Sequence, residues 1–214
     1  MLYDSIIRGG LILIDLKKFH KRLQNEGINF ITGVPDSLLN DFCSYVESNL
    51  SQKEHVIAAN EGNAIGLAAG HHLSTGGIPL VYMQNSGMGN ALNPLLSLVN
   101  KEVYSIPMIL LIGWRGSPDV DDWAHHKKQG RLTPELLDLM DIPYKILEEN
   151  ETQVFDSVKW AANKSNDINT PVALIAKRGV FSSSKKNNEY NKNEFSRENA
   201  IEEVIDNVPK NSFF

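Results

Sequence analysis

One carboxylate, Glu61, stands where a short strand predicted at residues 55–59 meets a predicted helix of small residues. The unpaired amide groups and the positive dipole end of that helix would lie beside the carboxylate. Small side chains would also let a flat ligand or another backbone approach the helix closely. An acid in such a wall can hydrogen-bond and protonate a ring nitrogen of a bound heterocycle. The competing interpretation is an ordinary first-turn glutamate, favoured only by the helix dipole.

A second polar segment, residues 84–90 (Gln-Asn-Ser-Gly-Met-Gly-Asn), follows a predicted strand and opens a predicted helix. Its glycines allow close backbone approach and its amides offer hydrogen bonds, which makes Asn85 and Gly87 candidates for ligand contacts. The segment lacks the Lys-Ser/Thr pair of a P-loop and the spacing of a dinucleotide-binding turn. A well-capped strand-to-helix turn is the alternative.

A long polar loop is predicted over residues 113–131, and loops of this length inside compact domains are usually functional or mobile. Within it, His126 is the candidate for proton transfer, because imidazole titrates near neutrality. Arg115 and Arg131 could bind a doubly charged anion or simply pair with nearby aspartates. The loop also contains acids and a second histidine, but adjacent histidines in a loop disfavour a metal site. Asp36, after another predicted strand, is equally compatible with a helix cap and with an acid that faces a site.

These residues need a scaffold, and helical and strand patterns alternate along the chain in a way typical of parallel sheets covered on both faces. Strands are predicted at 28–32, 55–59, 79–83, 108–112, 143–147 and 172–176. The predicted fold class is therefore α/β, with a doubly wound, about six-stranded, mainly parallel sheet. Such sheets bind ligands at the carboxyl ends of their strands, where the candidate residues fall.

Residue types also mark the predicted helix ends. Gly27 is expected to end the first helix, and Gly76 with the glycine after it the helix that follows Glu61. Ser37 is expected to cap the second helix. The Thr133-Pro134 pair is expected to open a later helix, because proline is favoured in the first helical turn.

Composition limits the classes of function. The 214 residues are 42% hydrophobic and 22% charged, which is typical of a soluble globular protein. The net charge of −5 favours neither nucleic acid nor an anionic membrane surface as a partner. The single cysteine, Cys43, excludes an internal disulfide and a cysteine-based zinc site, and it is expected to be buried. No apolar run approaches the roughly 20 residues of a membrane helix, and no signal peptide is recognised, so the cytoplasm is the expected location.

The pattern divides the chain into four parts. Residues 1–14 are expected to form an N-terminal extension and residues 15–180 one domain. Residues 181–196 are rich in Ser, Lys and Asn and are predicted to be an exposed linker. A helical pattern returns within residues 197–214, which are interpreted as the start of a second domain not included in this chain.

Three stretches together resemble the phosphonopyruvate decarboxylases, members of the thiamine-diphosphate-dependent 2-oxoacid decarboxylase superfamily. They are INFITGVPDSLL (28–39), AANEGN…LIGWRG (58–116) and KKQGRL…YKIL (127–147). The resemblance runs from about Asp15 to the end of the chain. It is specific because long stretches match in order, rather than one short motif.

This resemblance implies that residues 15–180 form a pyrimidine-binding domain for thiamine diphosphate. Glu61 matches the glutamate that hydrogen-bonds the aminopyrimidine ring, and Asn85 and Gly87 become cofactor-binding candidates. The implied catalytic residues are Glu61, Asp36 and His126. The implied substrate contacts are Asp36, Ser37, Arg115 and His126, with Arg115 assigned to the phosphonate group.

Two departures from the family pattern stand out. The family loop usually reads like Asp-Glu-Pro-Gln-His, whereas residues 122–126 read Asp-Trp-Ala-His-His. The Gly-Asp-Gly segment that holds the diphosphate and Mg²⁺ in a second domain is missing from this chain. The Mg²⁺ ligands are therefore expected in a missing domain or a partner, within a homo- or hetero-oligomer.

The resulting expectation is the pyrimidine-binding half of an enzyme that converts 3-phosphonopyruvate to phosphonoacetaldehyde and CO2. The expected partners are a small 2-oxoacid substrate and a diphosphate-binding domain or subunit, without nucleic acid or membrane. Two alternatives stay open. One is the α subunit of a sulfopyruvate decarboxylase, and the other is an inactive remnant that acts only in binding or dimerisation.

Overall fold

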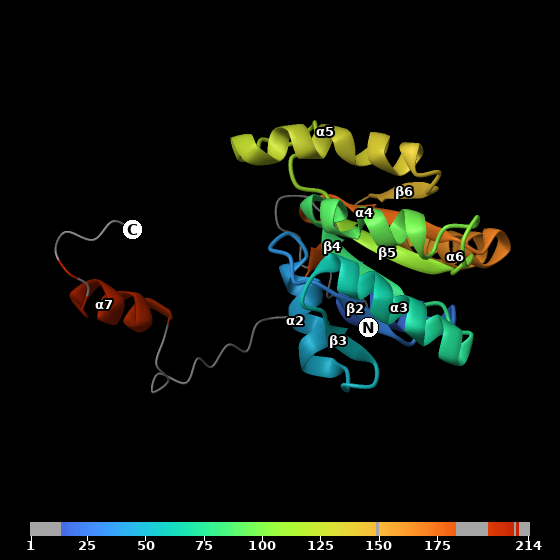
Figure 1. The fold of residues 1–214 in the computed structure, drawn as a ribbon, viewed down its shortest axis with the longest axis horizontal. Coiled ribbons are helices and arrows are strands. Elements are labelled where there is room, and N and C mark those ends of the chain that lie inside the picture. The colour runs from blue at the N-terminus through green and yellow to red at the C-terminus, as the bar shows by residue number, and fades with distance from the viewer. Residues whose placement is uncertain (1–13, 149, 183–196, 208, 210–214) are drawn as a thin grey trace, which may run out of the picture. The chain divides into compact units, whose positions relative to one another are not determined.

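The computed structural model describes residues 14–148, 150–182, 197–207 and 209, which belong to two units divided between Ser184 and Lys185. The first unit contains a six-stranded sheet in the order β3-β2-β4-β5-β7-β6, in which every neighbouring pair is parallel (Figure 1). The strands are β2 (Ile31–Gly33), β3 (His55–Ile57), β4 (Leu80–Gln84), β5 (Met108–Gly113), β6 (Tyr144–Leu147) and β7 (Pro171–Ala176). The predicted α/β class is confirmed.

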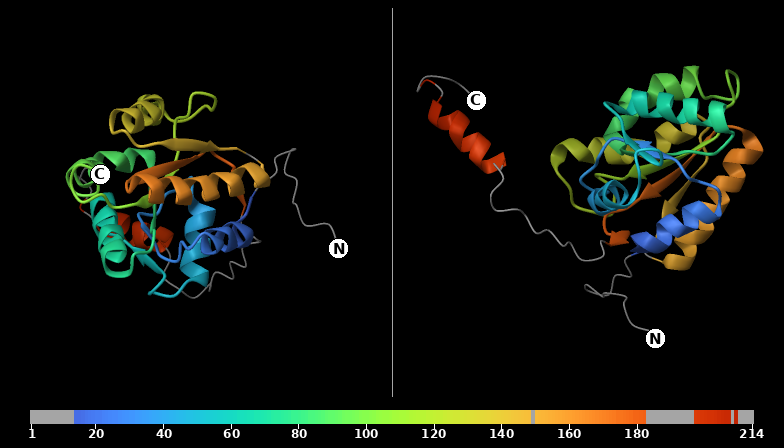
Figure 2. Two further views of the ribbon diagram at one scale, coloured as in Figure 1. Left: turned by 90° about the vertical axis from the view of Figure 1, so that its right-hand side faces the viewer. Right: turned by 90° about the horizontal axis from the view of Figure 1, so that it is seen from below.

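Helices cover both faces of this sheet (Figure 2). One face carries α1 (Leu16–Asn25), α2 (Asn40–Asn49) and α6 (Glu151–Ile168), and the other carries α3 (Glu61–Thr75), α4 (Met88–Ser97) and α5 (Ala124–Leu139). Strand side chains alternate between the two cores, as the pleat requires. In β4, Leu80 and Tyr82 enter the first core, while Val81 and Met83 enter the second. Cys43 is buried in the first core, as predicted.

Two predicted helix ends are confirmed and one predicted cap is wrong. Gly27 follows α1 at φ +79° and Gly76 follows α3 at φ +73°, left-handed conformations that glycine adopts without steric cost. The predicted cap by Ser37 is not formed, because α2 begins only at residue 40. Asp36 holds the turn instead, since its Oδ2 accepts a 3.2 Å hydrogen bond from the backbone N–H of Leu39.

The largest difference from the sequence prediction concerns α5. This helix begins well before the predicted start, so Pro134 lies inside it rather than in its first turn. A proline has no N–H for the carbonyl four residues earlier. That carbonyl, of Gly130, accepts a 2.7 Å hydrogen bond from Trp114 Nε1 instead. Because the lost helical hydrogen bond is replaced, the helix continues through the proline and takes up the second half of the predicted loop.

A small second sheet extends the predicted domain at both ends. β1 (Ile14–Asp15) pairs in parallel with β8 (Phe181–Ser182). Ile14 and Phe181 were assigned to the extension and the linker, yet both are buried in the first core, where the Phe181 ring lies 4.9 Å from that of Phe19. The other residues of the predicted extension and linker lie outside the described residues.

The second unit contains α7 (Arg197–Asn207), on which Ile201, Val204 and Ile205 are about half exposed. The assignment of this segment to the start of a second domain stays a prediction. In the described part of the chain, no helix combines the length and the apolar character needed to cross a bilayer.

Candidate active site

The direction of winding reverses between β2 and β4, which are neighbours in the sheet. The chain leaves β2 for α2 on one face and leaves β4 for α4 on the other. In doubly wound folds, the crevice between two such connections at the carboxyl edge of the sheet binds ligands. Asp36 follows β2, Glu61 follows β3 and Asn85 follows β4, so the fold brings these residues to one edge.

Glu61 is the first residue of α3 and is half-buried. Asn60 caps this helix, because its side-chain oxygen accepts a 2.9 Å hydrogen bond from the N–H of Asn63. The Glu61 carboxylate is therefore not needed as a cap. Its Oε2 accepts a 2.9 Å hydrogen bond from Nδ2 of Asn90 on α4, whereas Oε1 has no hydrogen-bond partner among the described residues.

Gly87 provides the space that this carboxylate occupies. A Cβ atom at Gly87 would overlap the Glu61 side chain from Cγ to Oε1, so a larger residue would force this carboxylate to move. A second close approach lies next to it, where a Cβ at Gly62 would sit 3.0 Å from the backbone oxygen of Asn90. That oxygen is free to face α3, since Pro94 has no N–H to offer it within α4.

Asn90 was missed by the sequence reasoning as an individual site residue. Its signals are the proline four residues later and its place at the end of the polar segment 84–90. These features indicate that the first turn of a helix packs closely against another segment. Only the structure shows that Asn90 contacts Glu61.

Asn85, in the short 3-10 helix η1 (Asn85–Gly87), is fully buried and ties three segments together. Its Nδ2 donates 2.9 Å hydrogen bonds to the backbone oxygen of Arg115 and to Thr133 Oγ1. Its Oδ1 accepts a 3.2 Å hydrogen bond from the N–H of Arg115. These hydrogen bonds show that the Asn85 side chain holds two elements in place, namely the loop that follows β5 and the helix α5. The cofactor contact predicted for Asn85 stays a prediction.

Asp36 is a buried acid with one oxygen unsatisfied. Its residue is 5% exposed, and Oδ1 has no hydrogen-bond partner in the described part of the chain. The other oxygen lies against Gly113 at the end of β5, where a Cβ would overlap it. Burial raises the pKa of Asp36, and backbone hydrogen bonds together with the charge of Arg115 oppose this shift only in part. The carboxyl group therefore holds its proton more tightly than an exposed aspartic acid does.

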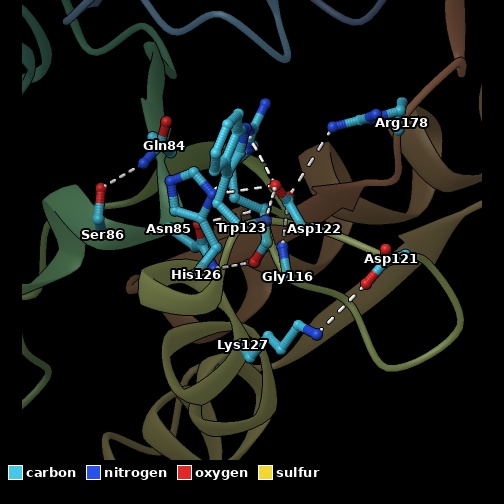
Figure 3. Close-up of polar contacts among 11 residues, drawn as sticks. Gln84, Asn85, Ser86, Gly116, Asp121, Asp122, Trp123, His126, Lys127 and Arg178 are labelled. Atoms are coloured by element: carbon cyan, nitrogen blue, oxygen red, sulfur yellow. Dashed lines mark hydrogen bonds and ion pairs between the residues drawn. The ribbon is translucent and has the colours of Figure 1, made fainter.

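Figure 3 shows a second acid, Asp122, at the centre of a polar cluster. Oδ1 of Asp122 lies 2.9 Å from Nη2 of Arg115 and 3.1 Å from Nδ1 of His126. The N–H of Trp123 donates to the same oxygen over 2.8 Å, and the N–H of Gly116 donates to Oδ2 over 3.0 Å. Although the burial of this side chain disfavours its charged form, hydrogen bonds and the charge of Arg115 hold the pKa of Asp122 well below its usual range.

An ionised Asp122 orients His126. When Nδ1 carries a proton, it donates to the carboxylate and leaves Nε2 of the same ring available. Among the described residues, Nε2 of His126 has no hydrogen-bond partner. The predicted candidates Arg115 and His126 are thus brought together by a third residue, which the sequence reasoning noted only within the loop pattern.

Two glycines bring α5 against the loop that follows β5. Gly116 has a φ of +67°, and a Cβ there would overlap the backbone of His126. A Cβ at Gly130 would in turn overlap the carbonyl of Gly116. With any larger residue at these positions the helix would move away, and His126 would separate from Arg115.

The predicted site residues therefore form two groups. Glu61 and Gly87 touch across α3 and η1, while Arg115 and His126 meet at Asp122. Asp36 lies near the second group through Gly113 and the charge of Arg115. Ser37 is exposed beside Asp36. In the described residues, no group of three or more His, Cys, Asp or Glu side chains converges as a metal site requires.

Comparison with known proteins identifies the family to which this fold belongs. Residues 17–142 match the family described as thiamine pyrophosphate enzyme, N-terminal TPP binding domain. The chain therefore belongs to the family of N-terminal cofactor-binding domains of thiamine diphosphate enzymes. The chemistry of Glu61 fits such a cofactor, because its Oε1 is a carboxylate oxygen without a hydrogen-bond partner among the described residues.

The similar curated proteins are decarboxylases. The phosphonopyruvate decarboxylase of Streptomyces viridochromogenes is 30% identical over 158 residues, which are 74% of this chain and 39% of that protein. The α subunit of the sulfopyruvate decarboxylase of Methanococcus maripaludis is 30% identical over 156 residues, which are 73% of this chain and 90% of that subunit. The chain thus spans well under half of the first relative and most of the second.

Solved structures support the fold. Benzoylformate decarboxylase from Polynucleobacter necessarius superposes with a TM-score of 0.62 at 16% identity, over 78% of this chain and 30% of that chain. A thiamine diphosphate-dependent 4-hydroxybenzoylformate decarboxylase from Rhodococcus jostii RHA1 gives a TM-score of 0.55 at 19% identity. At these identities the likeness concerns the arrangement of strands and helices.

Proposed function

We propose that this chain is the pyrimidine-binding half of a thiamine-diphosphate-dependent decarboxylase that acts on 3-phosphonopyruvate and yields phosphonoacetaldehyde and CO2. The observation that carries the proposal is the Glu61 carboxylate, which lies in the space left by Gly87 with Oε1 unpartnered. The cofactor, when bound, supplies the nucleophilic carbon and accepts the electron pair released as CO2 departs.

In this proposal Glu61 binds the aminopyrimidine ring through Oε1. Asn90 holds Oε2 and so fixes the rotation of the carboxylate. Gly87 makes room for the carboxylate itself, and the half-buried position of Glu61 removes water from one side of the contact. A hydrogen bond in such a place is stronger than the same bond in bulk water.

Asp36 and His126 are proposed to hold and move protons near the substrate. Asp36 suits this role because burial favours its protonated form and Oδ1 has no partner among the residues that the structure describes. His126 suits it because Asp122 orients the ring and Nε2 stays available. Arg115 and the exposed Ser37 are proposed as substrate contacts.

A second chain or domain is proposed to bind the diphosphate through Mg²⁺. The basis is the missing Gly-Asp-Gly segment and the match to only 39% of the Streptomyces viridochromogenes enzyme. Sulfopyruvate is a second candidate substrate, because the match covers 90% of a relative that is itself an α subunit. Phosphonate and sulfonate are both tetrahedral anions, and the site chemistry described above suits either.

Complementation tests the proposal. The chain is mixed with thiamine diphosphate, Mg²⁺ and either the unmatched remainder of the Streptomyces viridochromogenes enzyme or a partner subunit of the Methanococcus maripaludis decarboxylase. CO2 release is then measured with 3-phosphonopyruvate and with sulfopyruvate. We expect release from the mixture only, and its loss with Glu61→Gln. Release by the purified chain alone, or none with either partner, would contradict the proposal, and the second result would favour an inactive binding module.

A further inference from the structure

Arg178 follows β7 at the carboxyl edge of the sheet and was not among the predicted site residues. Its side chain is 55% exposed, and its Nη2 lies 3.9 Å from Oδ2 of Asp122 (Figure 3). This distance is too long for a hydrogen bond. Asp122 also has three closer donors and a closer contact with Nδ1 of His126, described above, so Arg178 adds a charge to the cluster without forming a hydrogen bond to this carboxylate.

The charges around Arg178 do not cancel. Lys177 is paired with Asp119 at 2.8 Å, and Lys127 is paired with Asp121 at 3.3 Å. Two guanidinium groups, however, share the single carboxylate of Asp122. Among the described side chains that contact Asp122, two guanidinium charges therefore face one carboxylate charge even when His126 is neutral, while the next acid, Asp36, interacts with Arg115. Excess positive charge at the rim of a site attracts anionic ligands.

Arg178 and Arg115 differ in how free their donors are. The Arg115 side chain is only 12% exposed, and its Nη2 and Nε contact Asp122 and His126. Arg178 keeps its donors available on the solvent side of the same carboxylate. A planar guanidinium with free donors is well suited to two oxygens of a tetrahedral anion.

We propose that Arg178, supported by Arg115, binds the second acidic group of the substrate, a phosphonate or a sulfonate carried by the 2-oxoacid. This inference rests on the proposed function and refines it, because the earlier assignment gave the phosphonate to Arg115 alone. Asp122 is then the positioning residue that keeps both guanidinium groups at one place. The site selects 2-oxoacids with a strongly acidic head group over those without one.

The groups of this head-group site all belong to the present chain, so binding is measured with the full chain and without a partner. Phosphonoacetate and sulfoacetate are titrated by calorimetry or NMR, with acetate as the reference that lacks the head group. We expect phosphonoacetate and sulfoacetate, the two head-group oxyanions, to bind more tightly than acetate. Arg178→Gln should weaken their binding at least about tenfold, and Arg178→Lys less, because charge is kept but the planar fork is lost.

The matched control is Lys101→Gln, which removes one positive charge from the exposed turn that precedes β5, at the opposite edge of the sheet. It should leave oxyanion binding unchanged. Equal binding by wild type and Arg178→Gln, equal binding of acetate and the oxyanions, or no oxyanion binding at all would overturn the proposal. Tighter binding of one oxyanion would support it and would identify the head group.

This result is separable from the proposed function. Glu61→Gln should leave oxyanion binding unchanged while it abolishes complemented CO2 release. If Arg178→Gln leaves oxyanion binding unchanged and complementation still depends on Glu61, the head-group assignment is wrong and the decarboxylase assignment stands.

Discussion

Asp36 and Asp122 show how one residue type acquires opposite pKa shifts at one edge of a sheet. Asp36 is buried beside a glycine with one oxygen unpartnered, and burial raises its pKa. The side chain of Asp122 is also buried, but it accepts hydrogen bonds on both oxygens and lies beside the charge of Arg115. These interactions outweigh the effect of burial and hold its pKa well below the usual range. The site therefore combines an acid that loses its proton more readily than usual with one that holds it more tightly than usual.

These opposite shifts predict opposite pH dependence of stability. For Asp36 the folded state binds the proton more tightly, so its contribution to the free energy of unfolding falls as pH rises from about 3.8 through the raised pKa. The stability of Asp36→Asn relative to wild type should therefore increase over that range and then level off. For Asp122 the stabilisation is present above its ordinary pKa and is lost as pH falls below 3.8.

Urea denaturation at several pH values from acid to neutral checks both statements. Asp122→Asn is the matched comparison, because it should lose stability relative to wild type at neutral pH and recover part of the difference in acid. A constant difference between Asp36→Asn and wild type at all pH values would show that Asp36 has an ordinary pKa.

At the same scale, the sequence identified residues that stand directly after strands. Glu61, Asp36 and Gly87 could be predicted because the carboxyl edge of a parallel sheet collects such residues. Asn90 and Arg178 could not, because their importance depends on a partner from a distant segment. Spacing within one segment carries no information about such contacts.

At the scale of elements, α5 depends on a contact between Trp114 and the carbonyl that Pro134 leaves free. Trp114→Phe should leave the buried Gly130 oxygen unsatisfied and destabilise the domain by about 1–3 kcal/mol, besides any loss of packing. In a Pro134→Ala background the new N–H can bond that oxygen, so the same change should cost less. Chemical denaturation of the four proteins measures this coupling, and strictly additive effects would contradict the account.

The same contact explains why the start of α5 was predicted too late. The residue before the helix, Trp123, makes no side-chain cap, so the local sequence lacks a usual start signal. The visible signal was Pro134, which normally belongs to a first turn. A tertiary hydrogen bond from Trp114 overrides that preference. By contrast, the strands and α3 carried their own signals in apolar runs and a terminal glycine, and they were predicted within a few residues.

The meeting of α3 with η1 gives a further prediction. Gly87→Ala would place a Cβ where the Glu61 carboxylate lies, and we expect complemented CO2 release to fall about 10- to 100-fold with little loss of secondary structure. Gly89→Ala is the control, because no atom lies within 4 Å of the Cβ it would add, and it should retain activity and gain slight helix stability. Normal activity of Gly87→Ala would show that the carboxylate position is unimportant.

At the scale of the whole molecule, α3 and α4 lie side by side (Figure 1). Both helices expose large apolar side chains. On α4, Leu92 and Leu96 are 40% and 43% exposed, and on α3 Leu67 is 41% exposed. Exposed apolar groups on adjoining elements commonly mark protein–protein interfaces. Because Glu61 begins α3, we expect this face to pack against another chain of the assembled enzyme.

Leu92→Glu should accordingly weaken assembly, since burying an unpaired charge at an interface is costly. Sedimentation velocity of the complemented mixture measures the effect. Leu139→Glu is the control, because Leu139 on α5 is 81% exposed and lies outside this face. Assembly that is equally tight for Leu92→Glu and wild type would exclude this face as the interface.

The central claim is that the free oxygen of Glu61 binds the pyrimidine ring of thiamine diphosphate and thereby activates it. The most direct measurement is the rate at which the C2 proton of the bound cofactor exchanges with deuterium in the complemented enzyme, followed by quenched-flow NMR. With Glu61→Gln we predict a rate at least about 100-fold lower, while Glu135→Gln, a change at an exposed glutamate of α5, leaves it unaltered. An exchange rate in Glu61→Gln equal to that of wild type would contradict the account.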